Sequence, residues 1–429
     1  MVPVAPTVAA LVLSIGAFAG EQDASDLALT APTPRRLPPI RIGHAFPKED
    51  AEAYLRVHAD LLTVYRKAHK RGWGLGALER GAIVAGERRS GNADCRSGWM
   101  RLTTGGYVCP SDGAEQLDGP DAEPMRVLAA DPASPLPFRY VKLADDAPIL
   151  AALPESGETI EQAPVVAHVE GVVFRAVDRP VDDGPVPMLR LVDGTYVPES
   201  AVTRRVEPPT ATGQPIVEAS LPIAFVVNDR APVYTLEQGR AQPVGHAERY
   251  ARFAVAEQVE RQGTAYVVAE DGEAVARDDV RVAATIDRPR HVDADDRWMH
   301  VDLDEQVLVA YEGDQPVYVT LVASGKDGFD TPAGLYRIRR KYVSRTMQGP
   351  DPDAGSYDIG DVPWTMYYYG GFAIHGAYWH DDFGKVRSHG CTNLPPESAR
   401  WLFSWSTPDV PEGWVGIHDA GTRIYFTRD

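Results

Sequence analysis

The chain has 429 residues, of which 44% are hydrophobic, so it is long enough for several domains with buried cores. Its formal net charge is −18, from 61 acidic against 43 basic side chains. This excess of acid argues against a nucleic acid or an anionic membrane as partner, because phosphate contacts need clusters of Lys and Arg.

Residues 1–20 have the pattern of a signal peptide. Val8–Phe18 is an uncharged, mostly apolar run, and Ala17-Phe18-Ala19 is a small-residue cleavage site. No Lys or Arg precedes the run, and a disordered apolar N-terminus is the alternative. The run is too short to span a bilayer, and no later stretch is long enough for a transmembrane helix. We therefore expect an exported protein, periplasmic or wall-associated, with a proline-containing linker at residues 21–44.

Residues 45–115 predict a helix followed by a small β module. Between Glu49 and Lys70 the apolar residues recur at helical spacing, which favours an amphipathic helix. Short β-prone pieces then follow at Ala82–Glu87 and Trp99–Leu102, separated by Gly, Ser and Asn turns. This part resembles a small bacterial SH3-like barrel, in which strands beginning Gly-Trp and Gly-Tyr-Val recur.

The three cysteines divide into an expected pair and a single thiol. Cys95 and Cys109 are 14 positions apart and flank a β-prone segment. In an exported protein we expect them to form a disulfide, which on the chain-entropy account stabilises by about 3 kcal/mol. Two separate buried thiols are the alternative in a cytosolic protein. Cys391 is left as a free thiol.

Two further segments, residues 137–206 and 216–285, have a similar organisation although their amino-acid sequences differ. Tyr140–Ile149 parallels Phe225–Tyr234, and each is followed by a strand with a turn and then by a short Val-containing segment. We interpret them as a degenerate repeat of SH3-like β modules. Such modules bind wall polymers or act as spacers, and the sequence leaves both open.

Residues 296–429 predict a mostly β, sandwich-like domain. Strand patterns run through Trp298–Val301, Gln306–Tyr311 and Gln315–Ala323, and two more, Trp364–Tyr369 and Phe372–His375, follow. Met347–Val362 is rich in Gly, Asp and Pro, and is expected to be a loop, either a lid over a cleft or an ordinary surface loop. The predicted fold class is therefore mainly β.

The candidate catalytic residues lie within this domain, in the segment Ile374–Leu394. It contains Cys391 and three of the chain's eleven histidines, His375, His380 and His389. A thiol becomes a good nucleophile when a neighbouring base takes its proton, so Cys with His is the minimal unit of thiol catalysis. A structural zinc site and an inert buried Cys are the alternatives, although one Cys is few for structural zinc.

A helix is predicted soon after the thiol. Pro395 and Pro396 suit its first turn, and Ala399, Leu402 and Phe403 share one face. A helix that begins two to five residues after Cys391 places its positive end near the sulfur, which favours the thiolate.

Ile374-His375-Gly376 and Ser388-His389-Gly390-Cys391-Thr392-Asn393 together resemble the signature of the L,D-transpeptidase (YkuD-type) catalytic domain. Thr331-Pro332 with Gly334 resembles the loop that usually precedes a strand of that family. The resemblance runs from about Arg297 to the C-terminus. It implies an exported enzyme that acts on peptidoglycan stem peptides and needs no metal or organic cofactor.

The resemblance also suggests roles for individual residues. Cys391 is the expected nucleophile and His375 its base, while His389 and the N–H groups of Gly390 and Cys391 are candidates for stabilising an oxyanion. Gly376 stands where other members carry Ser, so a backbone carbonyl is expected to orient the imidazole. The candidate substrate-binding residues are Gly376, Tyr378, Trp379, Arg387, Ser388 and Asn393.

The expected reaction is transfer of an acyl group from a stem-peptide donor through a thioester on Cys391 to an amine. The product is a wall crosslink or a protein attached to the wall. Two alternatives stay open from the sequence. One is a hydrolase, either an L,D-carboxypeptidase or a crosslink-cleaving enzyme, in which water takes the acyl group. The other is a wall-binding protein without catalysis. The sequence names no protein partner.

Overall fold

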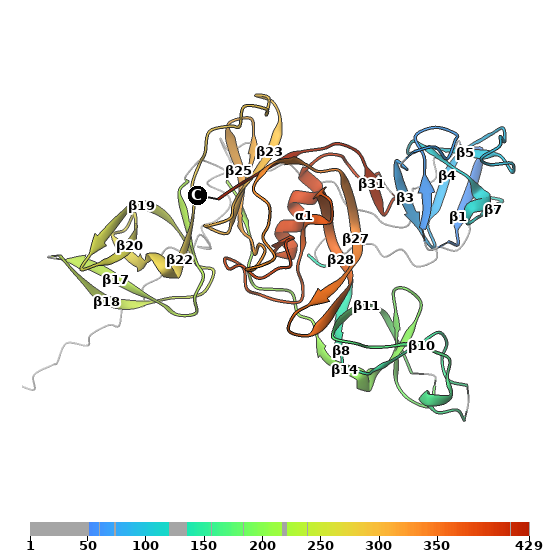
Figure 1. The fold of residues 1–429 in the computed structure, drawn as a ribbon, viewed down its shortest axis with the longest axis horizontal. Helices are drawn as coiled ribbons and strands as arrows, with labels where there is room; N and C mark the ends of the chain where they lie inside the picture. Colours follow the sequence, from blue (N-terminus) through green and yellow to red (C-terminus); the bar gives the residue numbers. More distant parts are fainter. Residues whose placement is uncertain are drawn as a thin grey trace, which may run out of the picture.

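The computed structural model describes residues 51–59, 61–72, 74–119, 135–155, 157–182, 184–216, 221–237, 239–411 and 413–428. The expected signal peptide (1–20) and linker (21–44) lie outside the described residues. The described chain is mainly β structure with one α-helix, so the predicted fold class is confirmed. Figure 1 shows a central C-terminal region (residues 296–428) with three smaller β modules around it. Within the described ranges, no helix is long and apolar enough to cross a membrane.

The first module (residues 51–119) is built from strands throughout. Its five-stranded sheet has the order β6-β5-β4-β1-β7, with β1 (Ala53–Val57), β4 (Ile83–Arg89), β5 (Trp99–Leu102), β6 (Tyr107–Val108) and β7 (Ala114–Leu117). The strands β2 (Leu61–Val64) and β3 (Gly76–Glu79) pair with each other beside it.

The helix predicted between Glu49 and Lys70 is wrong, because β1 and β2 occupy its described part. In β2, exposed and buried residues alternate, which is the period of a strand. Leu61 is 46% exposed, although the helical pattern required it to be buried. The helical spacing arose from two short strands on either side of a turn.

The second module (residues 135–206) and the third module (residues 221–283) share one organisation with the first. In each of the three, a 3₁₀ turn leads into a last strand that pairs antiparallel with the first strand. The strands of the second module are β8 (Arg139–Leu143), β9 (Pro148–Leu150), β10 (Val165–His168), β11 (Val172–Val181), β12 (Met188–Leu191), β13 (Tyr196–Pro198) and β14 (Val202–Arg205). Those of the third are β16 (Ile223–Val226), β17 (Ala231–Glu237), β18 (Arg240–Ala247), β19 (Arg252–Arg261), β20 (Thr264–Ala269), β21 (Glu273–Ala276) and β22 (Val280–Ala283). The SH3-like resemblance and the module boundaries stay predictions.

The C-terminal region packs two sheets and one helix around a shared core. One sheet contains β23 (Arg297–Asp302), β24 (Val307–Glu312), β25 (Gln315–Leu321), β26 (Gly334–Arg337) and β32 (Arg423–Thr427). The other contains β27 (Arg340–Asp351), β28 (Gly355–Tyr369), β29 (Phe372–Gly376), β30 (Thr392–Leu394) and β31 (Gly416–His418). The helix α1 (Pro396–Trp405) buries Ala399, Leu402 and Phe403 in the same cluster as Met299, Trp364 and Ile374.

The segment Met347–Val362, expected to be a loop, forms the far end of a long hairpin. Its residues belong to β27 and β28, apart from the turn between Asp351 and Gly355, and the pairing shifts register between Arg345 and Met347. The two strands remain paired from Arg340↔Tyr367 out to Asp351↔Gly355. The hairpin therefore projects well beyond the core, and its tip is free to form one wall of a cleft.

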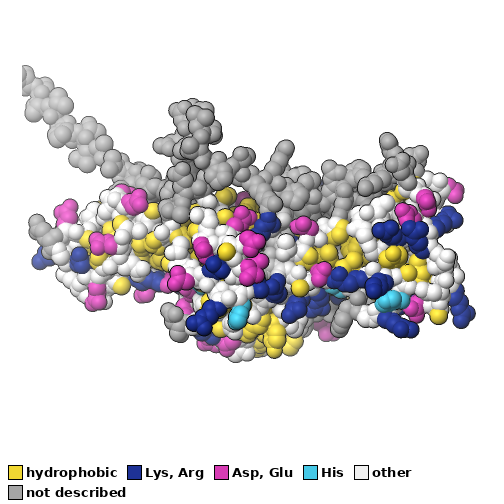
Figure 2. Space-filling view, turned by 90° about the horizontal axis from the view of Figure 1, so that it is seen from above, with side chains coloured by type: hydrophobic (Ala, Val, Ile, Leu, Met, Phe, Trp, Pro, Cys, Tyr) yellow, Lys and Arg dark blue, Asp and Glu magenta, His cyan; other side chains and the backbone are white. Residues whose placement is uncertain are grey.

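Strands from the N-terminal half continue the sheets of the C-terminal region. β3 pairs with β31, β11 pairs with β28, and the short β15 (Gln214–Pro215) pairs with β25. Covering an edge in this way satisfies backbone groups that would otherwise be unpaired. Each module also shares a hydrophobic cluster with the C-terminal region. On the face drawn in Figure 2, acidic and basic side chains are interspersed between apolar patches.

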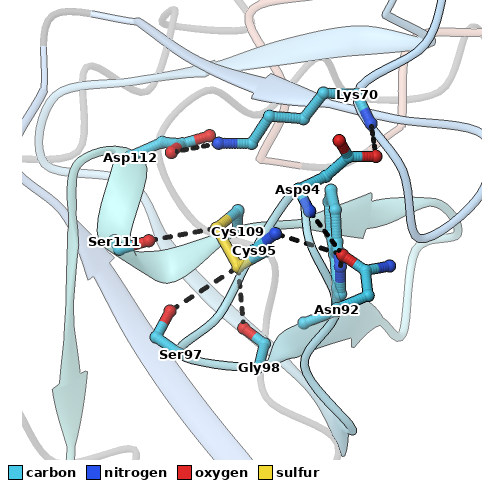
Figure 3. A network of polar contacts seen from close by, with 10 residues as sticks. Lys70, Asn92, Asp94, Cys95, Ser97, Gly98, Cys109, Ser111 and Asp112 are labelled. Carbon is cyan, nitrogen blue, oxygen red and sulfur yellow. Dashed lines mark hydrogen bonds and ion pairs between the residues drawn. A yellow bond between two sulfur atoms is a disulfide. The ribbon is translucent and has the colours of Figure 1, made fainter.

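The expected disulfide is present in the first module. Cys95 and Cys109 are bonded, with their Cα atoms 5.8 Å apart, and Cys391 is a free cysteine. Figure 3 shows the polar contacts around the bond. The side-chain oxygen of Asn92 accepts the N–H of Cys95 at 3.1 Å, and Lys70 pairs with Asp112 at 2.6 Å. The disulfide thus joins two turns that are already held by local contacts.

Candidate active site

A cleft of about 500 Å³ contains most of the predicted site residues. This volume is in the range of small-molecule and peptide sites. It is lined by Val172, Lys326, Met347, Asp351, Asp353, Ala354, Tyr357, Ile359, His375, Trp379, Val386, Arg387, Ser388, His389, Cys391 and Asn393. A second cavity of about 480 Å³, between β26, β32 and the end of β28, is lined by Tyr and Arg side chains and contains none of the predicted residues.

Two neighbouring strands bring the thiol and the imidazole to one face. β29 and β30 run parallel, with Ile374 beside Thr392 and His375 beside Asn393. Paired residues of neighbouring strands project to the same side, so His375 and Asn393 share a face, and Cys391 lies in the bend directly before β30. Both Cys391 and His375 line the cleft. The pairing of these strands therefore places the candidate nucleophile and base at one surface.

His375 is neutral because it is buried, and its ring is oriented by its own main chain. The ring is 2% exposed, and Nδ1 lies 3.3 Å from the carbonyl oxygen of Gly376. Burial lowers the pKa of His375 to about 4. A neutral ring whose Nδ1–H donates to a carbonyl leaves Nε2 as an acceptor. The carbonyl of Gly376 thus fills the place that a side chain would otherwise take in orienting the ring.

The Cys391 sulfur is a thiol in the resting site. Burial raises its pKa to about 11, and the N–H of Ala373 opposes this only in part. The sulfur lies 3.8 Å from the carbonyl oxygen of Gly371, and the residue is partly open to the cleft. α1 begins at Pro396, as expected. Desolvation is the largest cause of the upward shift, and a contribution of the helix dipole to the thiolate stays a prediction.

The loop before the thiol is fixed by its own hydrogen bonds. The hydroxyl of Ser388 donates to the carbonyl of Cys391 and accepts the N–H of Gly390 at 3.0 Å. The hydroxyl of Thr331 donates to the carbonyl of Gly390 at 2.8 Å. Gly390 has a φ of +112°, and a Cβ there would lie 2.6 Å from the ring of Phe372. Only glycine fits this position.

These bonds change the expected set of oxyanion donors. The N–H of Gly390 already donates to Ser388, so the prediction that it faces an oxyanion is wrong. The N–H of Cys391 remains a candidate. Outside the strand ladders, no partner for it occurs among the residues that the structure describes.

His389 is clamped between aromatic rings and a carboxylate. Its ring stacks on Tyr357 at 4.9 Å and meets Phe329 edge-on at 4.7 Å. Nε2 lies 3.0 Å from Oδ2 of Asp351, but the two atoms are not aligned for a hydrogen bond. Burial and Lys326 lower the pKa of His389, and Asp351 opposes the shift. Sequence reasoning missed Asp351 and Tyr357, which no motif marks.

The remaining predicted substrate-binding residues divide into two groups. Trp379, Arg387, Ser388 and Asn393 line the cleft. Tyr378 and Gly376 do not. The Tyr378 side chain is 1% exposed, stacks on Tyr140 at 3.7 Å and donates to the carbonyl of Gly360. Gly376 is buried in β29. The prediction that Tyr378 and Gly376 contact substrate is therefore wrong, because both side-chain positions face the interior.

His380–Asp382, which the family signature did not cover, supports the motif from behind. Nδ1 of His380 accepts the N–H of Asp382, and Nε2 lies 2.8 Å from the amide of Asn393. Burial lowers the pKa of His380 to about 3. Because Nδ1 accepts, the ring proton is on Nε2, and Asn393 must turn its amide oxygen toward it. Asp382 in turn pairs with Arg387 at 2.7 Å. Among the described residues, no group of three or more His, Cys, Asp or Glu has the arrangement of a metal site.

Comparison with known proteins assigns the C-terminal segment. Residues 296–425 match the sequence profile of YkuD, the L,D-transpeptidase catalytic domain. The resemblance drawn from the motifs is thereby confirmed for this segment, which is a YkuD-type domain. Among curated proteins, none matches the chain.

Similar solved structures include the Ldtfm–avibactam carbamoyl enzyme, with 28% identity over 31% of this chain and 49% of that chain, and a TM-score of 0.26. A mutant of the Enterococcus faecium L,D-transpeptidase has 25% identity over 34% of this chain and 55% of that chain, with a TM-score of 0.26. The L,D-transpeptidase from Mycobacterium smegmatis has 15% identity over 61% of this chain and 95% of that chain, also with a TM-score of 0.26. The chain spans about half the length of the first two structures. At such low TM-scores, the family assignment rests on the profile match.

Proposed function

We propose that the chain is an exported L,D-transpeptidase that moves the acyl group of a peptidoglycan stem peptide through Cys391. The observation that carries this proposal is that His375, on β29, and Cys391, directly before the neighbouring β30, line one cleft. The match of residues 296–425 supports peptidoglycan as the substrate class.

The proposed reaction begins from the neutral pair. Nε2 of His375 accepts the proton of the Cys391 thiol as the sulfur attacks the carbonyl carbon that precedes the terminal D-residue. The N–H of Cys391 donates to the oxyanion that forms. The C–N bond then breaks, and the imidazolium returns the proton to the leaving amine. The products of this half-reaction are a thioester on Cys391 and a free D-amino acid.

In the second half-reaction an amine attacks the thioester. His375 takes a proton from the attacking amine, and the sulfur leaves and regains a proton. An amine from a second stem peptide gives a wall crosslink, and an amine from a protein gives a wall-attached protein. Because a buried thiol is a poor nucleophile until it loses its proton, the neutral pair protects the sulfur until substrate is bound.

The residues along the cleft suit a charged peptide. Lys326, Arg387, His389, Asp351 and Asp353 supply the polar and charged part of the lining, while Met347, Ile359 and Trp379 supply an apolar part. A cleft with both parts accommodates the carboxylates and the aliphatic portions of a stem peptide. We propose that Arg387 and Asn393 contact the donor, with Asn393 oriented by His380.

The test is incubation of purified protein with disaccharide-tetrapeptide muropeptides, followed by mass spectrometry of the products. We expect crosslinked dimers, with one D-amino acid released for each dimer. Cys391→Ala should abolish turnover, and His375→Ala should lower it by about 10²–10⁴-fold. His291→Ala is the matched control, because this histidine is exposed and does not line the cleft.

The same experiment separates the alternatives. Tripeptide as the sole product identifies water as the acceptor and replaces transfer by hydrolysis. Sacculi bound equally well by the parent and by Cys391→Ala, without turnover by either, identify a wall-binding protein without catalysis.

A further inference from the structure

One wall of the cleft comes from outside the YkuD-type domain. Val172 lies at the start of β11 in the second module and lines the cleft, whereas every other lining residue lies between Lys326 and Asn393. Figure 1 shows β11 beside the hairpin of β27 and β28.

β11 extends the hairpin as a neighbouring strand. It pairs in parallel with β28, with Val172 beside Tyr357 and Phe174 beside Ile359. Neighbouring residues in a sheet project to the same side. Tyr357 and Ile359 both line the cleft, so Val172 continues the same surface.

A close backbone approach fixes the start of this pairing. Gly171, directly before β11, has a φ of +76°. A Cβ at this position would lie 2.3 Å from the main-chain oxygen of Ser356 and could not be accommodated without moving the backbone. The hydroxyl of Ser356 also donates to the carbonyl of Glu170 at 3.2 Å. The hairpin and β11 therefore fit each other only with glycine here.

The two parts share one hydrophobic core. Its buried side chains come from both, namely Leu136, Phe138, Tyr140, Phe174 and Ala176 from the second module, and Ile359, Val362 and Tyr378 from the C-terminal region. Val172, Met347, Tyr357 and Trp379 are partly buried against the same cluster and reach the cleft. Arg175 pairs with Asp358 at 2.6 Å beside it. The apolar wall of the cleft is thus the exposed margin of an interdomain core.

The position of the hairpin also affects His389. Asp351 and Tyr357 belong to the hairpin, and both contact the His389 ring. Because β11 pairs with the residues from Tyr357 to Ile359, the second module fixes the part of β28 that stacks on His389.

We propose that the second module is part of the substrate site. Val172 with Met347, Tyr357, Ile359 and Trp379 forms an apolar subsite that receives an aliphatic portion of the acyl-donor peptide. This inference rests on the proposed function and specifies one of its subsites. The module is then a component of the cleft, and its removal or displacement weakens donor binding.

The first test introduces a charge into the subsite. Val172→Asp should raise KM for the tetrapeptide donor at least tenfold and leave kcat within about threefold, because the carboxylate is desolvated against an apolar ligand. Alkylation of Cys391 by iodoacetamide, which is too small to need the subsite, should stay within about twofold of the parent. Val166→Asp is the control, since Val166 is 57% exposed on the same module and does not line the cleft.

The second test displaces the module without changing a lining side chain. Gly171→Ala should raise KM and speed hydrogen exchange in residues 355–361. Gly157→Ala is the matched control, because Gly157 has a φ of +94° in the same module but nothing within 4 Å of a Cβ. Both variants carry the same kind of backbone strain, so their difference reports the contact with Ser356.

The outcomes are separable. An unchanged KM in Val172→Asp and in Gly171→Ala, with normal parent turnover, overturns the subsite and leaves the proposed function intact. Equal effects of Gly171→Ala and Gly157→Ala also overturn it. If Val172→Asp lowers the melting temperature, Val172→Trp is the variant that tests the subsite. A larger apolar side chain at this position should still change KM if the subsite exists. If the parent protein shows no turnover although Cys391 is alkylated normally, the proposed function itself is refuted.

Discussion

The protonation state of the resting thiol is directly measurable. Desolvation by the surrounding protein raises the pKa of Cys391 from an ordinary 9.0 to about 11, although the residue is partly open to the cleft. At pH 8 this shift reduces the thiolate fraction roughly 100-fold. A thiolate of higher pKa is intrinsically the better nucleophile, by roughly tenfold for such a shift. We therefore expect Cys391 to react with iodoacetamide about tenfold more slowly at pH 8 than a free cysteine.

The assay follows alkylation of the Cys391 peptide by mass spectrometry from pH 7 to pH 10. Non-reducing conditions keep Cys95 and Cys109 in their disulfide. We expect the rate to rise about tenfold for each pH unit without a plateau, since the pH stays below the pKa throughout. The reference is a peptide of sequence Ser-His-Gly-Cys-Thr-Asn, whose rate should level off near pH 9.

The His375→Ala variant tests whether the resting imidazole is a neutral base or is already paired, as an imidazolium, with a Cys391 thiolate. A neutral His375 contributes nothing to the thiolate fraction, so this variant should alkylate with the same pH profile as the parent while losing turnover. A plateau in the parent below pH 8, abolished by His375→Ala, would show a resting thiolate–imidazolium pair and refute the reasoning from burial.

Three further predictions concern stability and the site. Replacing both Cys95 and Cys109 by Ala should lower the denaturant-measured stability of the first module by about 2–4 kcal/mol, without changing KM, as that module does not line the cleft. Burial holds the pKa values of His375 and His380 at about 4 and about 3, below the ordinary 6.5. As the pH falls, the histidines of the unfolded chain are protonated before those of the folded chain. The contribution of these two histidines to stability is therefore full above pH 6.5, and below it falls by up to about 1.4 kcal/mol per pH unit for each histidine. Urea midpoints measured across this pH range should fall less steeply in His380→Gln than in the parent. Asp351→Asn should lower the pKa of His389 further, since Asp351 opposes its downward shift. NMR titration of the His389 ring measures this pKa, and an unchanged value would show that Asp351 does not influence it.

Sequence reasoning succeeded where the relevant residues are close together in the chain. Alternation and turns located β23 and β24, and apolar spacing after two prolines located α1. The base and the thiol fall within one short stretch, with His375 on β29 and Cys391 directly before the neighbouring strand β30. The sequence led us to expect a backbone carbonyl beside the imidazole, and the structure shows that it is the carbonyl of Gly376.

It failed where a property depends on distant parts of the chain. The pKa of Cys391 is raised mainly by desolvation, which no local pattern reports and which the argument from the helix dipole left out. Tyr378 lies between the two halves of the motif, yet it packs on Tyr140 from the second module. The helix predicted between Glu49 and Lys70 failed for another reason, because residues on two short strands matched a helical period by coincidence.

The same contrast explains how the site is divided between motif and scaffold. The motif supplies a sulfur, an imidazole and a tightly bonded loop, all from Ile374 to Asn393. What the cleft accepts is set by the hairpin, whose far end packs on Tyr378 and Trp379 of its own region and on the second module. Strand β11 adds a neighbour through backbone pairing, which constrains position more strictly than side-chain contact alone. A chain that keeps the motif but changes the residues around Gly171 would therefore keep its chemistry and alter its choice of donor.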